Sequence, residues 1–341
     1  MATMTRVMVT GGGGFVGKNI VKRLRARGID VHVLARGSYP ELEALGCTMH
    51  RVDLADTDGV TRALAGCDTV FHVAARAGVW GPRQAFENAN VRGAENVLAA
   101  CHANGVQRLV FTSSPSVTFD GTDHVDASND LPYPTRWLSD YPRTKALGEA
   151  AVLAAASPDL HVVALRPHLV YGPDDPHLLP RLLARARAGR LRIVGDGTNR
   201  VSLTYVDNAA VAHLQAVDSL LRDGAASPAH GRAFFVNDAE PVVLWDWLNR
   251  LFGEVGVDPV RARVPAGLAY LVGSVAEGAW SLLGRTDDPP MTRFVARQLA
   301  TSHTYSLAPA REAFGYVPEV EGDDAFRRTV AWIRMSGFPA S

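Results

Sequence analysis

The stretch Thr10–Gly17 reads Thr-Gly-Gly-Gly-Gly-Phe-Val-Gly and directly follows the apolar run Val7–Val9. The next residues, Lys18–Leu24, carry apolar side chains at helical spacing, which places the glycines at a strand-to-helix turn. A glycine turn of this kind lets the backbone approach a pyrophosphate, and the helix N-terminus offers free N–H groups. The pattern therefore predicts that the chain begins by binding a dinucleotide.

Short apolar strands alternate with helices through the first half of the chain. The expected strands are Arg6–Thr10, Asp30–Ala35, Thr48–Val52, Thr69–Val73, Arg108–Thr112 and His161–Arg166, and the expected helices are Val16–Arg27, Tyr39–Leu45, Thr57–Leu64, Asn90–Asn104 and Tyr141–Ala156. This alternation predicts an α/β fold with a doubly wound parallel sheet of Rossmann type. We expect a dinucleotide-binding domain over 1–172, with a further strand and helix to about 219. A smaller, mostly helical substrate lobe over 173–341 would be partly interleaved with it.

Composition narrows the class of partner. Lys and Arg together number 35, as do Asp and Glu, so the net charge of zero argues against nucleic acid. The three cysteines have no metal-ligand spacing, and we expect no metal and a reducing, cytoplasmic location. The apolar segment 264–284 contains prolines and glycines that disfavour a spanning helix. We expect a buried helix or pocket lid there, with peripheral membrane contact as the alternative.

Tyr141 and Lys145 stand four residues apart at the start of an expected helix, so their side chains share one face. A nearby ammonium favours phenolate and would lower the tyrosine pKa, which suits proton transfer near neutral pH. Ser114, at the end of the expected strand Arg108–Thr112, could hydrogen-bond the same substrate oxygen, with Ser113 and Ser116 as substitutes. We predict Ser114, Tyr141 and Lys145 as the catalytic group.

With these motifs in order, the chain resembles the extended short-chain dehydrogenase/reductase superfamily over residues 6 to about 215. The matching segments are Thr10–Gly17, Asp53–Leu54, His72–Ala75, Asn90–Gly93, Thr112–Ser114, Tyr141–Lys145 and Arg166–Pro173. The resemblance selects the spacing Gly11-x-x-Gly14-x-x-Gly17 over Gly12-x-Gly14-x-x-Gly17. It implies a tyrosine acid/base, a lysine on the nicotinamide ribose, a homodimer through 90–104 and 141–156, and hydride chemistry supplied by the cofactor. The cofactor-binding residues that it implies are Gly11, Gly14, Phe15, Val16, Gly17, Asp53, Leu54, Ala74, Ala75, Tyr141, Lys145 and Pro167.

The end of the second expected strand bears on the choice of cofactor. Enzymes that use NAD usually place an acid there to bind the ribose 2′-hydroxyl, whereas this chain has Arg36 and then Ser38. Arg36 can pair with a 2′-phosphate and Ser38 can donate a hydrogen bond to it. An arginine that merely stacks on adenine is the alternative, in which case NAD(H) would serve. We favour NADP(H).

Further features resemble the 3β-hydroxysteroid dehydrogenase-like branch and its bacterial 2-alkyl-3-ketoalkanoate reductases. These features are the loop Arg76–Gly81, the apolar segment 264–284 and the stretch Asp288–Arg293. The resemblance implies an oxidoreductase that interconverts a hydrophobic 2-alkyl-3-keto acid and its 3-hydroxy acid. Alternatives are a 3β-hydroxysteroid or sterol-4α-carboxylate 3-dehydrogenase, a nucleotide-sugar epimerase or dehydratase, and a non-catalytic NADP(H) sensor. The candidate substrate residues are Trp80, His168 and Arg200.

Overall fold

Seven parallel strands form the central sheet of the protein, which a computed structural model describes over residues 3–336. In spatial order these strands are β12 (Arg232–Val236), β7 (His161–Pro167), β5 (Arg108–Thr112), β4 (Thr69–His72), β1 (Arg6–Thr10), β2 (Asp30–Ala35) and β3 (Thr48–Arg51). The strand order reverses between β1 and β4, and ligands bind at the carboxyl edge at such a point in a doubly wound sheet. The predicted fold class is confirmed.

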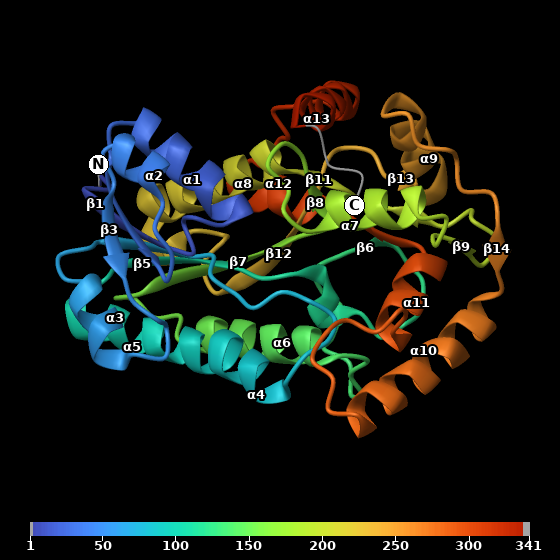
Figure 1. Cartoon of the computed structure of the whole chain (residues 1–341). Coiled ribbons are helices and arrows are strands. Elements are labelled where there is room, and N and C mark those ends of the chain that lie inside the picture. Colours follow the sequence, from blue (N-terminus) through green and yellow to red (C-terminus); the bar gives the residue numbers. More distant parts are fainter. Residues whose placement is uncertain (1–2, 337–341) are drawn as a thin grey trace.

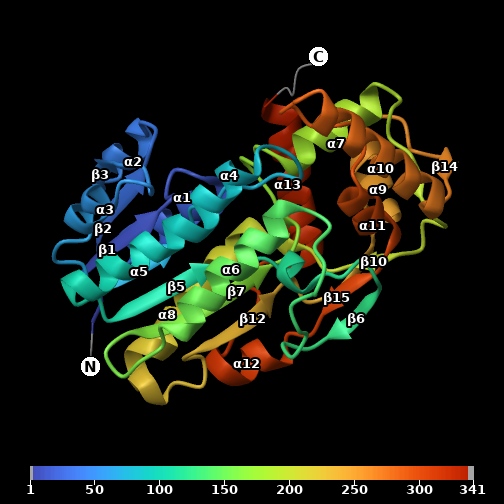
Figure 2. The ribbon, with the colours of Figure 1, turned by 90° about the horizontal axis from the view of Figure 1, so that it is seen from below.

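Helices cover both faces of this sheet (Figures 1 and 2). One face carries α1 (Phe15–Ala26), α2 (Pro40–Ala44), α8 (Val206–Asp223) and α12 (Ala308–Phe314), and the other carries α3 (Thr57–Ala63), α5 (Gly93–Asn104) and α6 (Asp140–Ala154). Successive side chains of a strand point to opposite faces. Val7 and Val9 accordingly pack in the first core, while Met8 between them packs in the second.

A third core lies beyond the carboxyl edge of the large sheet (Figure 2). Its helices are α7 (Leu178–Arg187), α9 (Leu244–Glu254), α10 (Ala266–Leu282), α11 (Arg293–Ala300) and α13 (Gly322–Ser336). A four-stranded sheet beside them runs in the order β13 (Val242–Val243), β10 (Arg200–Val201), β15 (His303–Tyr305) and β6 (His124–Ala127). Two short pairs, β8 (Val170–Tyr171) with β11 (Thr204–Tyr205) and β9 (Ile193–Val194) with β14 (Arg263–Val264), complete this region.

The chain crosses the predicted division at residue 172 more often than its sequence suggested. β12 pairs with β7 in the large sheet, and α12 packs in the same core as α1 and α8, although both follow residue 219. Conversely, β6 lies before residue 172 in the sequence but pairs with β15, a strand of the second region. The interleaving of the two regions is therefore more extensive than predicted.

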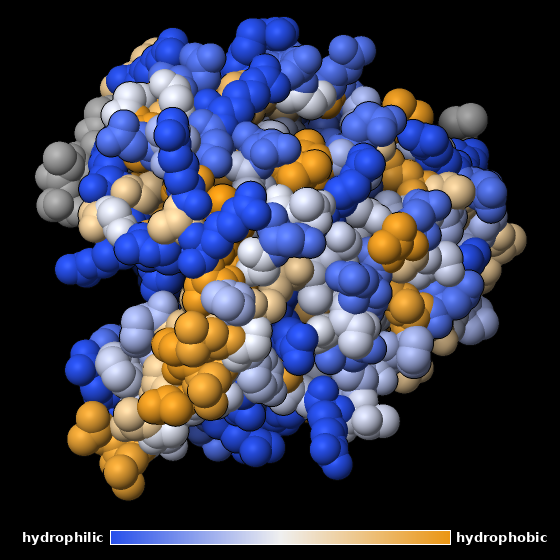
Figure 3. Space-filling view, turned by 90° about the vertical axis from the view of Figure 1, so that its right-hand side faces the viewer, coloured by the Kyte–Doolittle hydropathy of each residue, from blue (hydrophilic) through white to orange (hydrophobic). Residues whose placement is uncertain are grey.

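α10 contradicts the expected buried helix. Its buried residues are Ala269, Gly273, Ala276 and Glu277. A methyl group on Gly273 would lie 2.7 Å from the Thr292 carbonyl carbon, and Glu277 accepts hydrogen bonds from Arg293. Its outer face is exposed and apolar, and Figure 3 shows apolar side chains gathered along the lower edge of this side of the molecule. The exposed residues are Leu268, Leu271, Val272, Val275 and Leu282, followed by Leu283.

The exposure of α10 arises because the close approach of α11 needs small residues on the inner face and leaves the long aliphatic side chains outside. Within residues 3–336, no helix is long and apolar enough to cross a bilayer. Contact of the 264–284 segment with a membrane surface stays a prediction, as does the homodimer.

Candidate active site

The glycine turn before α1 opens into a cleft of about 940 Å³. Gly11 has φ +67°, and a methyl group there would lie 2.7 Å from Ala74 Cα. A methyl group on Gly17 would collide with the Gly11 carbonyl oxygen. Gly11, Gly14 and Gly17 line the cleft, whereas Gly12 packs on Val33 inside the protein. The spacing Gly11-x-x-Gly14-x-x-Gly17 therefore forms the cradle, and its missing side chains fit the backbone approach that a pyrophosphate needs.

The cleft brings together residues that are up to 167 positions apart in the sequence, from Gly11 to Leu178, at the carboxyl edge of the large sheet. The predicted residues among its lining are Gly11, Gly14, Phe15, Val16, Gly17, Arg36, Asp53, Leu54, Ala74, Ala75, Ser114, Tyr141, Lys145 and Pro167. The residues present thus fit a dinucleotide, with the pyrophosphate at α1 and the reacting end near Tyr141.

Tyr141 and Ser114, two of the predicted catalytic residues, meet at one end of the cleft. Burial raises the pKa of the Tyr141 phenol, and a hydrogen bond with the Ser114 side chain opposes that rise. Ser114 is held by the turn that follows β5, where its hydroxyl lies 2.9 Å from Ser116 Oγ and accepts a hydrogen bond from the Ser116 N–H. Of the three candidate serines, Ser114 is the one in contact with the phenol, and Ser116 does not line the cleft.

Lys145 is buried one turn after Tyr141 on α6. Its ammonium donates to the Thr112 carbonyl at 2.6 Å and lies 4.2 Å from the centre of the Phe111 ring. Burial lowers the pKa of Lys145 to about 7, although the Glu149 carboxylate acts in the opposite direction. The expected lowering of the tyrosine pKa by this lysine is not seen in the protein alone, because burial dominates the phenol and Ser114 is the group that lowers its pKa.

A buried ionic network that sequence reasoning missed supports this end of the cleft. Glu149 accepts hydrogen bonds from Arg166 at 2.6 and 2.9 Å, and from the Tyr133 hydroxyl at 2.7 Å. Glu149 lies one turn beyond Lys145 on α6, and Arg166 belongs to β7. The network ties α6 to the sheet. Only the tertiary structure reveals it, because the three residues come from separate segments.

The far end of the cleft, after β2, carries cations in place of an acid. Arg36 lines the cleft, while Ser38 is exposed beside it and accepts a hydrogen bond from Arg51 Nη2 at 2.7 Å. Glu41, the nearest acid in the sequence, pairs with Lys18 at 2.8 Å. Arg51, at the end of β3, is a second cation here that the sequence analysis did not identify.

The loop that follows β4 is fixed by Asn90. The Asn90 side chain accepts a hydrogen bond from the Arg76 N–H at 2.7 Å, and it donates to the Arg76 carbonyl at 3.1 Å and to Thr144 Oγ1 at 3.0 Å. The sequence predicted that Asn90 starts α5, but this helix begins only at Gly93. Asn90 lies in a π-helical stretch, η1 (Glu87–Arg92), that precedes the helix, and such stretches often accompany functional sites.

The three predicted substrate residues lie in different surroundings. Trp80 lines a second cavity beside the cleft, and its indole N–H donates to the Arg285 carbonyl at 3.0 Å. His168 lines neither cavity: it is buried against His303, with ring centres 4.7 Å apart, and its ring nitrogen bonds the Ser202 carbonyl. Arg200 is exposed on β10, bonded to the Pro241 carbonyl. His168 and Arg200 therefore do not line the cleft: His168 is held in the interior by Ser202 and His303, and Arg200 lies on the paired strand β10.

Comparison with known proteins decides the family. A model of the 3-beta hydroxysteroid dehydrogenase/isomerase family matches residues 8–265. The chain belongs to this family. As a 3-beta hydroxysteroid dehydrogenase/isomerase family member, it is an NAD(P)-dependent oxidoreductase of the extended short-chain type that acts on CH–OH groups.

Relatives within and beyond the family cover nearly the whole chain. The 2-alkyl-3-oxoalkanoate reductase of Stenotrophomonas maltophilia (strain K279a) is 45% identical over 328 residues, 96% of this chain and 98% of that protein. The Homo sapiens sterol-4-alpha-carboxylate 3-dehydrogenase, decarboxylating, is 35% identical over 338 residues, 96% of this chain and 88% of the human protein. Among solved structures, MoeE5 in complex with UDP-glucose and NAD matches 97% of this chain and 99% of its own, with a TM-score of 0.69 and 26% identity.

Proposed function

We propose that this protein is an NADP(H)-dependent oxidoreductase that interconverts a hydrophobic 2-alkyl-3-oxo acid and its 2-alkyl-3-hydroxy acid. One observation carries the proposal: a single cleft is lined by Ser114, Tyr141 and Lys145 and also by Arg36, which stands after β2 where NAD enzymes usually have an acid. The likeness to the Stenotrophomonas reductase along the full chain supports the substrate class.

In this proposal the chain's own residues hold the substrate oxygen and move its proton. The Ser114 hydroxyl donates a hydrogen bond to the oxygen as negative charge develops on it. The Tyr141 phenol gives its proton to that oxygen in reduction and takes it back in oxidation. The Lys145 ammonium, within the same helix, holds the ribose hydroxyls. The bound nicotinamide supplies or accepts the hydride.

The preference for NADP(H) rests on the residues around the end of β2. Arg36 supplies a guanidinium that can bind a 2′-phosphate in bidentate fashion. Arg51 adds a second positive charge beside Ser38, whose hydroxyl hydrogen is free to donate to the phosphate. Glu41 is engaged by Lys18, so it does not offer its carboxylate to a ribose 2′-hydroxyl. A phosphate is therefore favoured over a hydroxyl at this position.

A second candidate is oxidation of a sterol-4α-carboxylate at its 3-hydroxyl, which the human relative favours at 35% identity. Both substrates carry an oxygen two carbons from a carboxylate in a hydrocarbon frame. The test is a spectrophotometric assay with NADPH and NADP⁺ against 2-alkyl-3-oxo acids, 4-carboxysterols and nucleotide sugars. We expect turnover of the alkyl acids. Turnover of sterol acids alone would favour the second candidate, and cofactor binding without turnover of any substrate would favour a sensor.

A further inference from the structure

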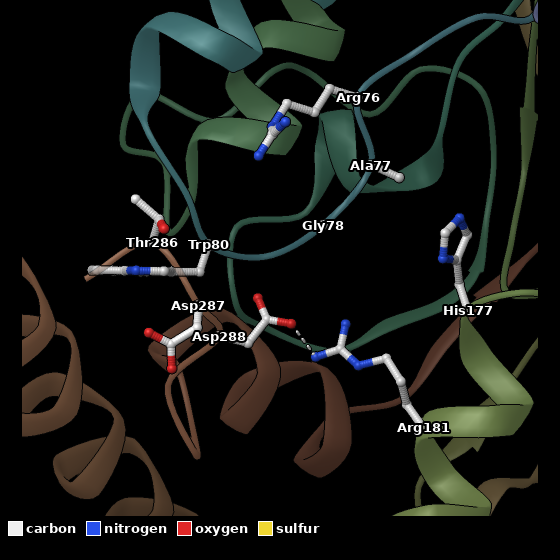
Figure 4. A pocket seen from close by; sticks show the side chains of 9 residues that line it. All are labelled: Arg76, Ala77, Gly78, Trp80, His177, Arg181, Thr286, Asp287 and Asp288. Carbon is white, nitrogen blue, oxygen red and sulfur yellow. Dashed lines mark ion pairs between the residues drawn. The ribbon is translucent and has the colours of Figure 1, made fainter. Parts of the chain in front are cut away.

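A second cavity of about 370 Å³ opens beside the cofactor cleft, and we call it the side chamber. Arg76, Ala77 and His177 line both spaces, so the side chamber continues from the reacting end of the cleft. Figure 4 shows Arg76 reaching into the chamber from one side and Trp80 forming a wall. A substrate held at Tyr141 thus has room beyond the reacting carbon, and Arg76 stands at the junction.

The charges of the side chamber leave one cation uncompensated. Arg181 Nη2 pairs with Asp288 at 2.6 Å on the side opposite Arg76 (Figure 4). Asp287 pairs with Arg285, through contacts of 2.6 and 2.9 Å. Within the described residues, Arg76 has no carboxylate partner, and its guanidinium carbon lies 5.2 Å from the centre of the Phe86 ring. The two aspartates are neutralised by their own arginines, so Arg76 can accept an anion.

Although the Arg76 side chain is exposed, the backbone that carries it is fixed by hydrogen bonds to a buried side chain. The buried Asn90 side chain satisfies both the N–H and the C=O of Arg76. The same amide reaches Thr144, the residue before Lys145 on the catalytic helix. The loop that carries Arg76 therefore has a fixed position relative to α6. A group that orients a substrate needs such a fixed position.

From this placement we infer that Arg76 binds the carboxylate of the substrate at the junction of the cleft and the side chamber. The inference rests on the proposed function, because it concerns an acid whose 3-oxygen is held by Ser114 and Tyr141. A guanidinium binds a carboxylate with two parallel charge-assisted hydrogen bonds. Arg76 thereby selects acids over neutral ketones or alcohols. The apolar wall of Trp80 is left for hydrocarbon.

The experiment compares oxidation of a 2-alkyl-3-hydroxy acid and of its methyl ester by NADP⁺ in the intact protein and its variants. Arg76→Met removes the charge, and Arg76→Lys keeps it without the bidentate geometry. Arg190→Met is the matched control, since Arg190 is exposed and lines neither cavity. The thermal midpoints of all variants are compared first; because Arg76 is exposed, we expect them to be unchanged.

For Arg76→Met we expect kcat/KM for the acid to fall ~10–100-fold, mainly through KM, since losing a charged hydrogen bond costs that much. The ester should change less than about 3-fold on the same scale, with Arg76→Lys intermediate and Arg190→Met unchanged. Equal losses for acid and ester, or no loss for the acid, overturn the inference while the proposed function stands. A wild-type protein that oxidises neither compound overturns both.

Discussion

Glu149 on α6 and Arg166 on β7 form a buried bidentate ion pair, with the two nitrogens of Arg166 at 2.9 and 2.6 Å from the two carboxylate oxygens of Glu149. Glu149 is fully buried and Arg166 is 4% exposed. Removing one partner of such a pair leaves an uncompensated charge in the protein interior, which is more damaging than the absence of the pair itself.

We predict that Glu149→Gln lowers the free energy of unfolding by about 3–5 kcal/mol. Urea unfolding at pH 7 measures this change in the free energy of unfolding. The control is Glu254→Gln, which removes the exposed partner of Arg334 at 2.8 Å and should cost less than about 1 kcal/mol. If the two variants lost similar stability, the buried pair would not have the role assigned to it.

Acid should destabilise the protein through buried histidines that the native state keeps neutral. His213 is fully buried: one ring nitrogen lies 2.7 Å from Thr112 Oγ1 and the other 2.7 Å from the Ala209 carbonyl. Burial lowers its pKa to about 4, from an ordinary 6.5. Between those values the unfolded chain binds a proton that the native state excludes, so stability falls as the pH falls from about 6.5 to 4.

For His213→Gln we expect a shallower loss of unfolding free energy between pH 7 and pH 5 than for the wild type. His102→Gln on the exposed face of α5 is the control and should keep the wild-type slope. Urea unfolding at the two pH values gives both slopes. An unchanged slope in His213→Gln would remove this histidine from the acid response.

Arg36 and Arg51 should set the choice between the two nicotinamide cofactors. We expect Arg36→Asp to weaken NADPH binding at least ~10–100-fold, because it removes a charge-assisted contact, and to leave or improve NADH binding. Arg51→Ala should weaken NADPH binding less than Arg36→Asp does, because Arg51 contributes through its contact with Ser38. Fluorescence titration of each cofactor measures the ratio. Equal weakening of both cofactors would show that Arg36 only stacks on adenine.

Gly17 should tolerate an added side chain less well than Gly14, its neighbour in the cradle. An added methyl group at Gly17 collides with the Gly11 carbonyl oxygen, which belongs to rigid backbone, whereas one at Gly14 approaches that oxygen only to 3.2 Å. We therefore expect Gly17→Ala to weaken cofactor binding more than Gly14→Ala. Gly267→Ala on the exposed surface of α10 meets nothing within 4 Å and should leave binding unchanged. Cofactor affinity that stayed intact in Gly17→Ala would contradict this geometry.

Local patterns were sufficient to predict six strands of the large sheet and the cradle. Arg6–Thr10 and Asp30–Ala35 are short apolar runs bounded by turns, and both lie where the sequence places them. β12 was not predicted, because its partner β7 precedes it by about 70 residues and nothing near it in the sequence marks it as a strand of the same sheet. β6 and β15 have only four and three residues, so neither strand can be recognised from the sequence before the two pair.

The same limit applies to the site. Tyr141 and Lys145 stand on one turn of helix, so their spacing predicts their shared face. Arg51 meets Ser38, and Asn90 meets Arg76, only after the chain has folded. His168 was mistaken for a substrate residue because the end of a strand is a typical position for one; pairing with Ser202 and His303 in the interior excludes it.

Proton transfer by Tyr141 is tested by the rate of NADPH-dependent reduction of a 2-alkyl-3-oxo acid by the wild type and by Tyr141→Phe. We expect turnover by the wild type and a kcat lower by about 10²–10⁴ in the variant, as expected for loss of a general acid. NADPH affinity should be unchanged, because only the hydroxyl is lost and the aromatic ring remains. A Tyr141→Phe protein that kept most of its kcat, or a wild type that reduced none of these acids, would contradict the account.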